Sequence, residues 1–167
     1  MFKHLLVPLD GSELSEKALT TARAVLGSED TLTLLNVVDM PDANLVVLYD
    51  MPVVPAYEDH HKLVATAQTN ARTYLQHLAE RMQLPPTITL NVEVYLGNAT
   101  TVIVERAQAL HVDAIVMSTH GRSGISRWMY GSVTQRVLAL MPCPVLVVPG
   151  QSISSPQPTP SDAAANA

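Results

Sequence analysis

The chain has 167 residues, a formal net charge of −5 at pH 7, and 47% hydrophobic against 15% charged residues. This composition indicates a globular fold rather than disorder, and the length suits a single domain. The apolar runs are shorter than the ~20 residues that a membrane-spanning helix needs. The net acidity argues against nucleic acid as a partner, because affinity for a phosphate backbone requires many basic side chains on one surface.

The N-terminus and the cysteine content indicate the compartment. Residues 1–10, MFKHLLVPLD, carry one lysine and a short apolar run that soon meets Pro8 and Asp10, which favours a first strand over a signal peptide. Cys143 is the only cysteine, so no intrachain disulfide is possible and a reducing environment suits the chain. We therefore expect a cytoplasmic protein without a membrane partner.

The N-terminal part of the chain predicts a strand, a helix and a second strand. Residues 4–9, HLLVPL, are an apolar run that ends at Asp-Gly-Ser. A helix is predicted next, closed by Gly27, because four apolar residues recur at helical spacing: Leu14, Ala18, Ala22 and Val25. Residues 31–38, TLTLLNVV, are almost all apolar or β-favouring, as expected of a strand that is covered on both faces of a sheet.

The rest of the chain continues this alternation. An apolar face predicts a long helix from Val64 that ends before Pro85. Residues 88–96 alternate strictly between apolar and polar, which indicates a half-exposed edge strand. The remaining predicted elements are a helix over about 101–110, a strand over 114–117, a helix from about Ser132, and a proline-flanked edge strand over 144–149.

The order of these elements predicts an α/β fold. It is a single doubly wound sheet of five parallel strands in the order 3-2-1-4-5, with right-handed crossovers and helices on both faces. In such sheets ligands bind outside the carboxyl ends of the strands, where the strand order reverses. Here that point lies between the first and fourth strands. Asp10 ends the first strand and residues 118–121 leave the fourth.

Two regions fall outside the repeated pattern. Residues 39–57 form a long, apolar, proline-containing connection, which either acts as a lid or interaction surface or covers the sheet. Residues 150–167 are rich in proline, serine and alanine and have little to bury, so we expect a disordered tail after a domain that spans residues 1–149.

The segment STHGRSGISRWMYGSVTQRV, residues 118–137, contains three arginines and three glycines but no carboxylate. A helix that begins near Ser132 offers unpaired N–H groups to an anion, and Gly131 lets that anion approach the backbone. The alternative is that Ser132 is only an N-cap and that the glycines only permit turns. Each residue taken alone favours that alternative, but their coincidence at the predicted switch point favours an anion site.

Other common sites are not supported by the sequence. It has no P-loop, no Gly-x-Gly-x-x-Gly after the first strand and no Gly-x-Ser-x-Gly elbow. His60 and His61 are adjacent, so on a helix their side chains point about 100° apart and do not chelate one metal. His120 has no evident nucleophile and acid beside it. We therefore assign no catalytic residue.

Four segments together resemble the universal stress protein family: LLVPLDGSELSEKAL, LLNVVD, DAIVMSTHGRSGISRWMYGSVTQRVL and CPVLVV. The resemblance covers residues 1–149. Nucleotide-binding members of the family carry Gly-x-x-Gly, nine residues, and then Gly-Ser/Thr. Gly121, Gly131 and Ser132 reproduce this pattern, whereas Ser118 stands in the place of the first glycine.

The resemblance implies ATP as the ligand and assigns a role to each matching residue. Asp10 would contact the ribose or adenine side, with Pro8 shaping that wall, and Val37 would offer backbone groups to the adenine edge. Met117 and Ser118 would line the floor near the ribose and the α-phosphate. The phosphates would be surrounded by Gly121, Arg122, Gly131, Ser132, Val133 and Thr134. Magnesium, where present, would reach Asp10 through the bound nucleotide. The family also implies a homodimer through residues 144–149.

Two functions remain open on these grounds. The first is an ATP-binding stress-response protein whose nucleotide is a regulatory or conformational ligand and whose hydrolysis is at most slow. The second is a nucleotide-free dimeric interaction module, which Ser118 in place of glycine favours. An ATP-using transferase or hydrolase would need a catalytic motif that the sequence lacks.

Overall fold

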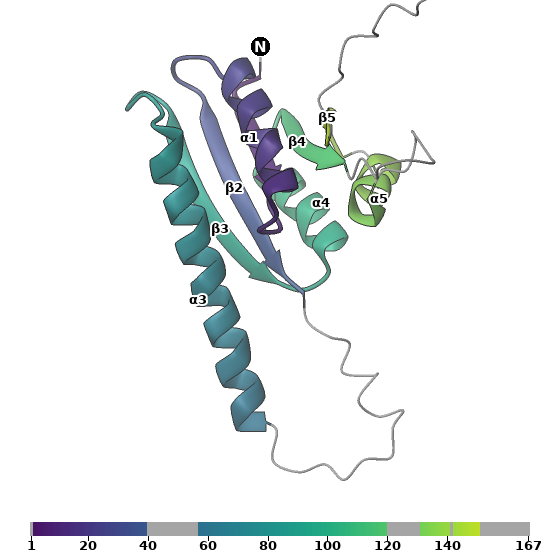
Figure 1. Ribbon diagram of the computed structural model, residues 1–167. Coiled ribbons are helices and arrows are strands. Elements are labelled where there is room, and N and C mark those ends of the chain that lie inside the picture. The colour runs from purple at the N-terminus through teal and green to yellow at the C-terminus, as the bar shows by residue number, and fades with distance from the viewer. Residues whose placement is uncertain (1, 40–56, 120–130, 141, 151–167) are drawn as a thin grey trace, which may run out of the picture.

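Strands and helices alternate along the chain in the computed structural model, which describes residues 2–39, 57–119, 131–140 and 142–150 (Figure 1). The strands are β1 (His4–Pro8), β2 (Thr31–Val38), β3 (Thr89–Leu96), β4 (Ala114–Thr119) and β5 (Val145–Pro149). The helices are α1 (Glu13–Val25), α3 (Tyr57–Met82), α4 (Ala99–Ala109) and α5 (Ser132–Leu140). Every strand and helix expected from the sequence is present.

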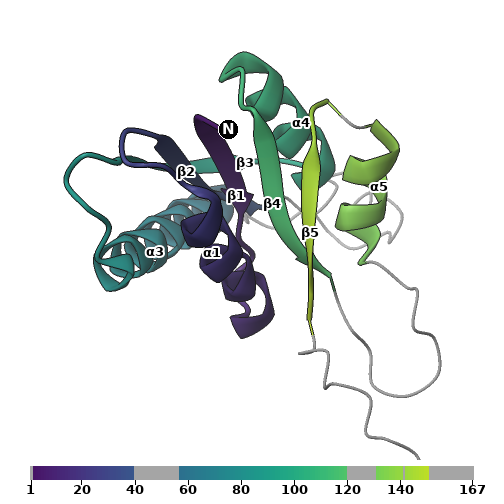
Figure 2. The same ribbon diagram turned by 90° about the horizontal axis from the view of Figure 1, so that it is seen from above.

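The strands form one parallel sheet in the order β3-β2-β1-β4-β5, which confirms the predicted order and both predicted edges. Helices α1 and α3 cover one face, and α4 and α5 cover the other (Figure 2). The fold is therefore the predicted doubly wound α/β architecture. None of the helices in the described ranges is long and apolar enough to cross a membrane.

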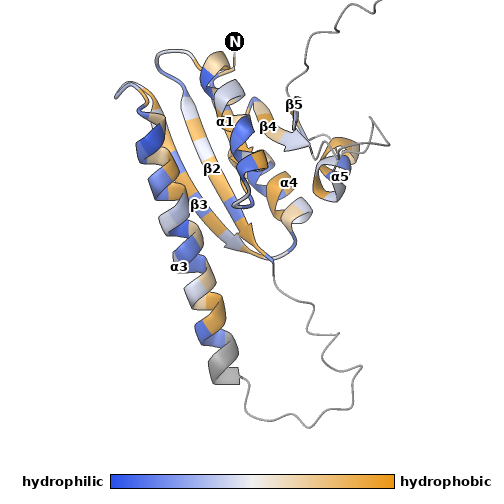
Figure 3. Cartoon of the chain, viewed as in Figure 1, coloured by the Kyte–Doolittle hydropathy of each residue, from blue (hydrophilic) through white to orange (hydrophobic). Residues whose placement is uncertain are grey.

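The two faces of the sheet support two hydrophobic clusters. Under α1 and α3, Leu5 and Leu34 are fully buried together with Leu75 of the long helix. Under α4 and α5, Leu6 and Ile115 are fully buried. Because both faces are covered, the central strands are apolar along most of their length (Figure 3).

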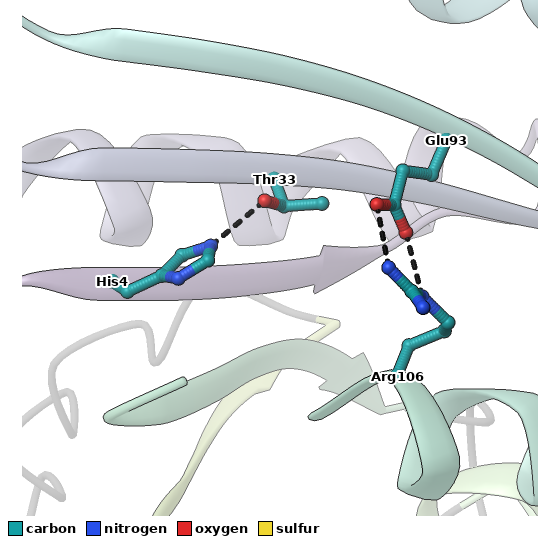
Figure 4. A network of polar contacts seen from close by, with 4 residues as sticks. All are labelled: His4, Thr33, Glu93 and Arg106. Atoms are coloured by element: carbon teal, nitrogen blue, oxygen red, sulfur yellow. Dashed lines mark hydrogen bonds and ion pairs between the residues drawn. The ribbon is translucent and has the colours of Figure 1, made fainter. Parts of the chain in front are cut away.

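Polar side chains on the α4 side of the sheet are paired with one another (Figure 4). Arg106 of α4 makes two hydrogen bonds, of 2.9 and 2.8 Å, to the carboxylate of Glu93 on β3. Its guanidinium carbon also lies 4.9 Å from the ring centroid of Tyr95. The His4 Nε2 and Thr33 Oγ1 atoms, on β1 and β2, are 2.9 Å apart. The Arg106–Glu93 pair therefore fastens α4 to β3, and the His4–Thr33 contact joins β1 to β2.

Several element boundaries differ from the predicted ones by one or two residues, and the largest difference is at the start of α3. Helix α3 begins at Tyr57 and not at Val64, so residue 57 belongs to the helix and not to the preceding connection. The apolar face used for the prediction begins at Val64, and Leu63, just before it, is 68% exposed. Strand β4 continues past Met117 because Ser118 and Thr119 still pair with β5. Residues 40–56 and 151–167 lie outside the described residues, and the expectations for them stay predictions.

Candidate functional site at the switch point of the sheet

The backbone pairing between β1 and β4 stops before the strands end. Their register contains only two pairs, Leu5 with Ala114 and Leu6 with Ile115. Beyond these pairs β1 continues to Pro8 and β4 to Thr119, each paired with its outer neighbour instead. The switch point predicted from the strand order is therefore a gap between two strand ends.

A cleft lies at this gap and contains about 670 Å³ of empty space, including open solvent. Nine of the residues predicted for the site line it: Pro8, Asp10, Val37, Met117, Ser118, Gly131, Ser132, Val133 and Thr134. The structure thus brings together residues that are more than a hundred positions apart in the chain. Gly121 and Arg122 lie outside the described residues.

Five further lining residues were not expected from the sequence: Leu9, Ser15, Leu35, Ala99 and Ile103. Leu9 and Leu35 lie in the strands predicted over residues 4–9 and 31–38, but the strand patterns did not assign them to the site. Ala99 and Ile103 belong to the first turns of α4, and only the crossover from β3 places that turn against the cleft. Ser15 is buried on α1 and was hidden within a predicted helix.

Asp10 forms the β1 side of the cleft as a carboxylate held by its neighbours. Its Oδ1 accepts hydrogen bonds from the Ser12 backbone N–H at 3.0 Å and from the Ser12 hydroxyl at 2.6 Å. Partial burial alone would raise the pKa of Asp10, but these hydrogen bonds outweigh it and lower the pKa below the ordinary value. Asp10 is therefore ionised at neutral pH.

Two serines build the start of α1 next to this carboxylate. Ser12 is the N-cap, and its hydroxyl oxygen accepts a hydrogen bond from the Ser15 backbone N–H at 3.1 Å. The Ser15 hydroxyl donates to the Ser12 carbonyl oxygen at 2.8 Å and accepts from the Asp10 backbone N–H at 3.4 Å. The strand-to-helix turn is thus closed by its own side chains.

The start of α5 forms the opposite side. The helix begins at Ser132, has no acidic residue in its first turn, and makes its first backbone hydrogen bond from the Gln135 N–H to the Gly131 carbonyl at 2.9 Å. The N–H groups before Gln135 have no partner within the helix. Because they lie at the positive end of the helix dipole, this side of the cleft favours an anion.

Ser118 lies in a regular strand, where the family pattern has glycine. Among the described non-glycine residues, positive φ angles occur at Gln83 and His111, so the backbone at residue 118 does not need the conformational freedom of glycine. Its side chain is half-buried and lines the cleft. Serine at this position therefore changes the space and the polarity of the cleft without straining the strand.

The remaining lining is apolar. Leu35 and Val37 come from β2, Met117 comes from β4, and Ile103 comes from α4. Asp10 is the only carboxylate among the described lining residues. In the described parts of the chain, no three His, Cys, Asp or Glu side chains gather as a metal site. A divalent cation here would need oxygens from a bound ligand in addition to Asp10.

The parallel sheet, with helices on both faces and a cleft at its switch point, defines an α/β protein of the doubly wound class. The carboxylate of Asp10 and the N-terminus of α5 make this cleft a candidate ligand site. The model of the universal stress protein family matches residues 1–149. The chain belongs to the universal stress protein family.

Individual relatives agree with this assignment. A universal stress protein of Methanocaldococcus jannaschii is 28% identical over 156 residues, which cover 89% of this chain and 82% of the relative. The structure of universal stress protein UspA from Lactobacillus plantarum is 25% identical with a TM-score of 0.68, over 87% of this chain and 97% of that one. A family protein of Arabidopsis thaliana, solved with AMP bound, shares the fold at 13% identity with a TM-score of 0.57, over 90% and 93% of the two chains.

Proposed function

We propose that this chain binds ATP in the cleft between β1 and β4 and uses it as a regulatory or conformational ligand in a cytoplasmic stress response. The observation that supports the proposal is that a carboxylate and a helix N-terminus line the same cleft. Asp10 and an apolar floor lie on one side, and the N-terminus of α5, with no acidic residue in its first turn, lies on the other.

Each part of the cleft suits one part of the nucleotide. The apolar floor of Leu35, Val37 and Met117 suits a planar base, because binding there removes apolar surface from water. The ionised Asp10 accepts hydrogen bonds from ribose hydroxyls or contributes an oxygen to a nucleotide-bound magnesium ion. The N–H groups of Ser132 and Val133, which have no partner within α5, suit phosphate oxygens. The AMP-bound relative supports an adenine nucleotide as the ligand to test.

Regulation is favoured over catalysis by the shortage of proton acceptors. Among the described lining residues Asp10 is the only carboxylate, and one of its oxygens already accepts two hydrogen bonds from Ser12. No described lining side chain is a histidine or lysine that would orient water or neutralise a leaving phosphate. We therefore expect hydrolysis to be absent or slow.

The direct experiment is to purify the full chain, denature it, and identify any released nucleotide, followed by equilibrium titration with ATP with and without magnesium. We expect released ATP or ADP, saturable binding by the stripped protein, and loss of both in Gly131→Val. Ala109→Val, on an exposed helical position of α4, adds a branched side chain away from the cleft and is the matched control. No adenine nucleotide binding at millimolar concentration would reject the proposal.

We also propose that the protein forms a homodimer through β5. This strand is at the edge of the sheet, its residues Val145 to Val148 are all half-buried, and its outer backbone groups face no strand among the described residues. Sedimentation of the full chain should give the mass of two chains, and Val147→Arg should give the mass of one. A monomeric wild-type chain at micromolar concentration would reject this interface and, with it, the alternative of a nucleotide-free dimeric module.

A further inference from the structure

The two strand ends that flank the cleft share one feature: a buried side chain from a neighbouring element donates a hydrogen bond to a carbonyl oxygen of each. On the β1 side, Asn36 Nδ2 of β2 donates to the Leu9 carbonyl at 2.8 Å. On the β4 side, Thr134 Oγ1 of α5 donates to the Ser118 carbonyl at 3.1 Å. Asn36 is 9% exposed and Thr134 is 4% exposed.

Both hydrogen bonds lie beyond the last backbone pair between β1 and β4. After Leu6 and Ile115 the β1–β4 register contains no further pairs, so neither strand end fixes the other. The β1 end is held on its outer side, by the Leu9 N–H to the Leu35 carbonyl at 2.8 Å and by the Asn36 bond. The β4 end is held by β5 and by the Thr134 bond. The width of the cleft therefore depends on the contacts that each strand end makes with other elements, and not on contacts between the two strand ends.

The Thr134 bond also restricts what this residue does for a ligand. A threonine hydroxyl has one hydrogen to donate, and here Ser118 receives it. An ionised phosphate oxygen only accepts hydrogen bonds. While the bond to Ser118 lasts, Thr134 does not donate to a phosphate. Instead it fixes the first turn of α5 against the end of β4, and this turn carries the N–H groups of Ser132 and Val133.

We propose that Thr134 and Asn36 are positioning residues, which keep the α5 and β1 sides of the cleft in their binding geometry before the ligand enters. The proposal rests on nucleotide binding as the function of the cleft. A preformed site binds more tightly because less conformational freedom is lost on binding. Removing either hydrogen bond should therefore weaken nucleotide binding even though neither side chain donates to the nucleotide.

A second buried threonine provides a matched control, which separates an effect on binding from an effect on stability alone. Thr33, on β2, is a fully buried threonine whose hydroxyl lies 2.9 Å from His4 Nε2, and it does not line the cleft. Figure 4 shows this contact. Thr33→Val and Thr134→Val make the same change of a buried hydroxyl to a methyl group. Only the second should alter the cleft.

The test compares ATP affinity by calorimetric titration with the unfolding midpoint in denaturant, for the full chain and four variants. Thr134→Val should lose about tenfold in affinity, the size expected when one net hydrogen bond no longer orders the site. Asn36→Leu should lose affinity by a similar factor. Thr134→Ser keeps the hydroxyl and should stay within about twofold of the wild type. Thr33→Val should lower the unfolding midpoint without changing affinity.

Amide hydrogen exchange of the nucleotide-free proteins supplies a readout that does not depend on ATP. Exchange at the Gln135 N–H, which closes the first turn of α5, should be faster in Thr134→Val than in the wild type and unchanged in Thr33→Val. Wild-type affinity in both Thr134→Val and Asn36→Leu, or equal losses in Thr33→Val, would overturn the inference. If the wild type binds no ATP, the proposed function fails, and an unchanged Gln135 exchange rate would overturn the positioning role as well.

Discussion

Strand β1 is paired over very different lengths with its two neighbours. With β2 the register runs from His4 opposite Thr31 to Pro8 opposite Leu35, whereas with β4 it contains two pairs. Buried leucines lie along the boundary with β2, which stays paired. The cleft lies where the pairing with β4 ends. One strand thus contributes to the core at one boundary and to the cleft at the other.

Because of this difference, we expect substitutions at the two boundaries to have different effects on stability and on binding in the cleft. Paired, buried positions contribute mostly to the free energy of unfolding, because their side chains lose contact with water and pack on both faces. Positions at the cleft border open space on one side, so we expect them to contribute less to stability. The following predictions test that separation, from the largest expected effect to the smallest.

Leu34→Ala in β2 should cost about 2–5 kcal/mol of unfolding free energy, because it leaves a cavity in the fully buried cluster under α1 and α3. Chemical denaturation measures this loss. In the fraction that stays folded, ATP affinity should remain within about twofold of the wild type. A larger loss of affinity than of stability would show that the core and the cleft are not separable.

Glu93→Gln on β3 should cost about 1 kcal/mol of unfolding free energy, because it removes the ionic partner of a two-bond contact with Arg106. The side chains are 21% and 22% exposed, so part of the effect should disappear in high salt. A double-mutant cycle with Arg106→Met measures the coupling. Additive losses would show that the pair contributes nothing beyond its separate contacts.

His4, at the amino end of β1, should make the protein less stable as the pH falls below about 6.5. Burial lowers the pKa of His4 from its ordinary value of 6.5, so the unfolded chain takes up a proton at a higher pH than the folded one does. Stability is then lost between pH 6.5 and the lower pKa of the folded state. His4→Gln should flatten the stability profile in this window, and an unchanged profile would contradict the prediction.

Asp10, just after the carboxyl end of the same strand, should act in a separate and lower pH window. Its pKa in the folded state lies below the ordinary value of 3.8, so its contribution is complete above that pH and is lost as the pH falls through the folded value. Because Asp10 is exposed, we expect a small effect. Comparing Asp10→Asn with the wild type in acid unfolding isolates it, and a difference confined to neutral pH would be inconsistent with this assignment.

The sequence predicted most of the fold because its signals are local. Apolar runs, strict alternation, helical spacing and flanking prolines predicted both edges of the sheet and the switch point between β1 and β4. Several lining residues of the cleft, such as Val37 and Met117, were expected only from the family resemblance. The start of α3 was predicted too late, at Val64 instead of Tyr57. An apolar pattern indicates burial, and Leu63, just before Val64, is 68% exposed, so this pattern does not mark the start of the helix.

The hydrogen bonds of Asn36 and Thr134 could not be predicted from local sequence patterns. Asn36 is a single amide in an otherwise apolar strand, and a buried amide must find a partner, so the sequence could have marked it for attention. That its partner is the Leu9 carbonyl depends on the β1–β2 register. The Thr134 bond depends in the same way on how α5 returns to β4. Such contacts belong to the tertiary arrangement and not to any one segment.

Titration of isotope-labelled protein with ATP, followed through backbone amide shifts by NMR, shows whether the cleft binds the nucleotide. We expect shifts at Leu9 and Asp10, at Met117 and Ser118, and in the first turn of α5, with little change at His4 and Thr33. Saturable shifts confined to the amino ends of the strands, or no shifts at millimolar ATP, would contradict the assignment of the cleft as a nucleotide site.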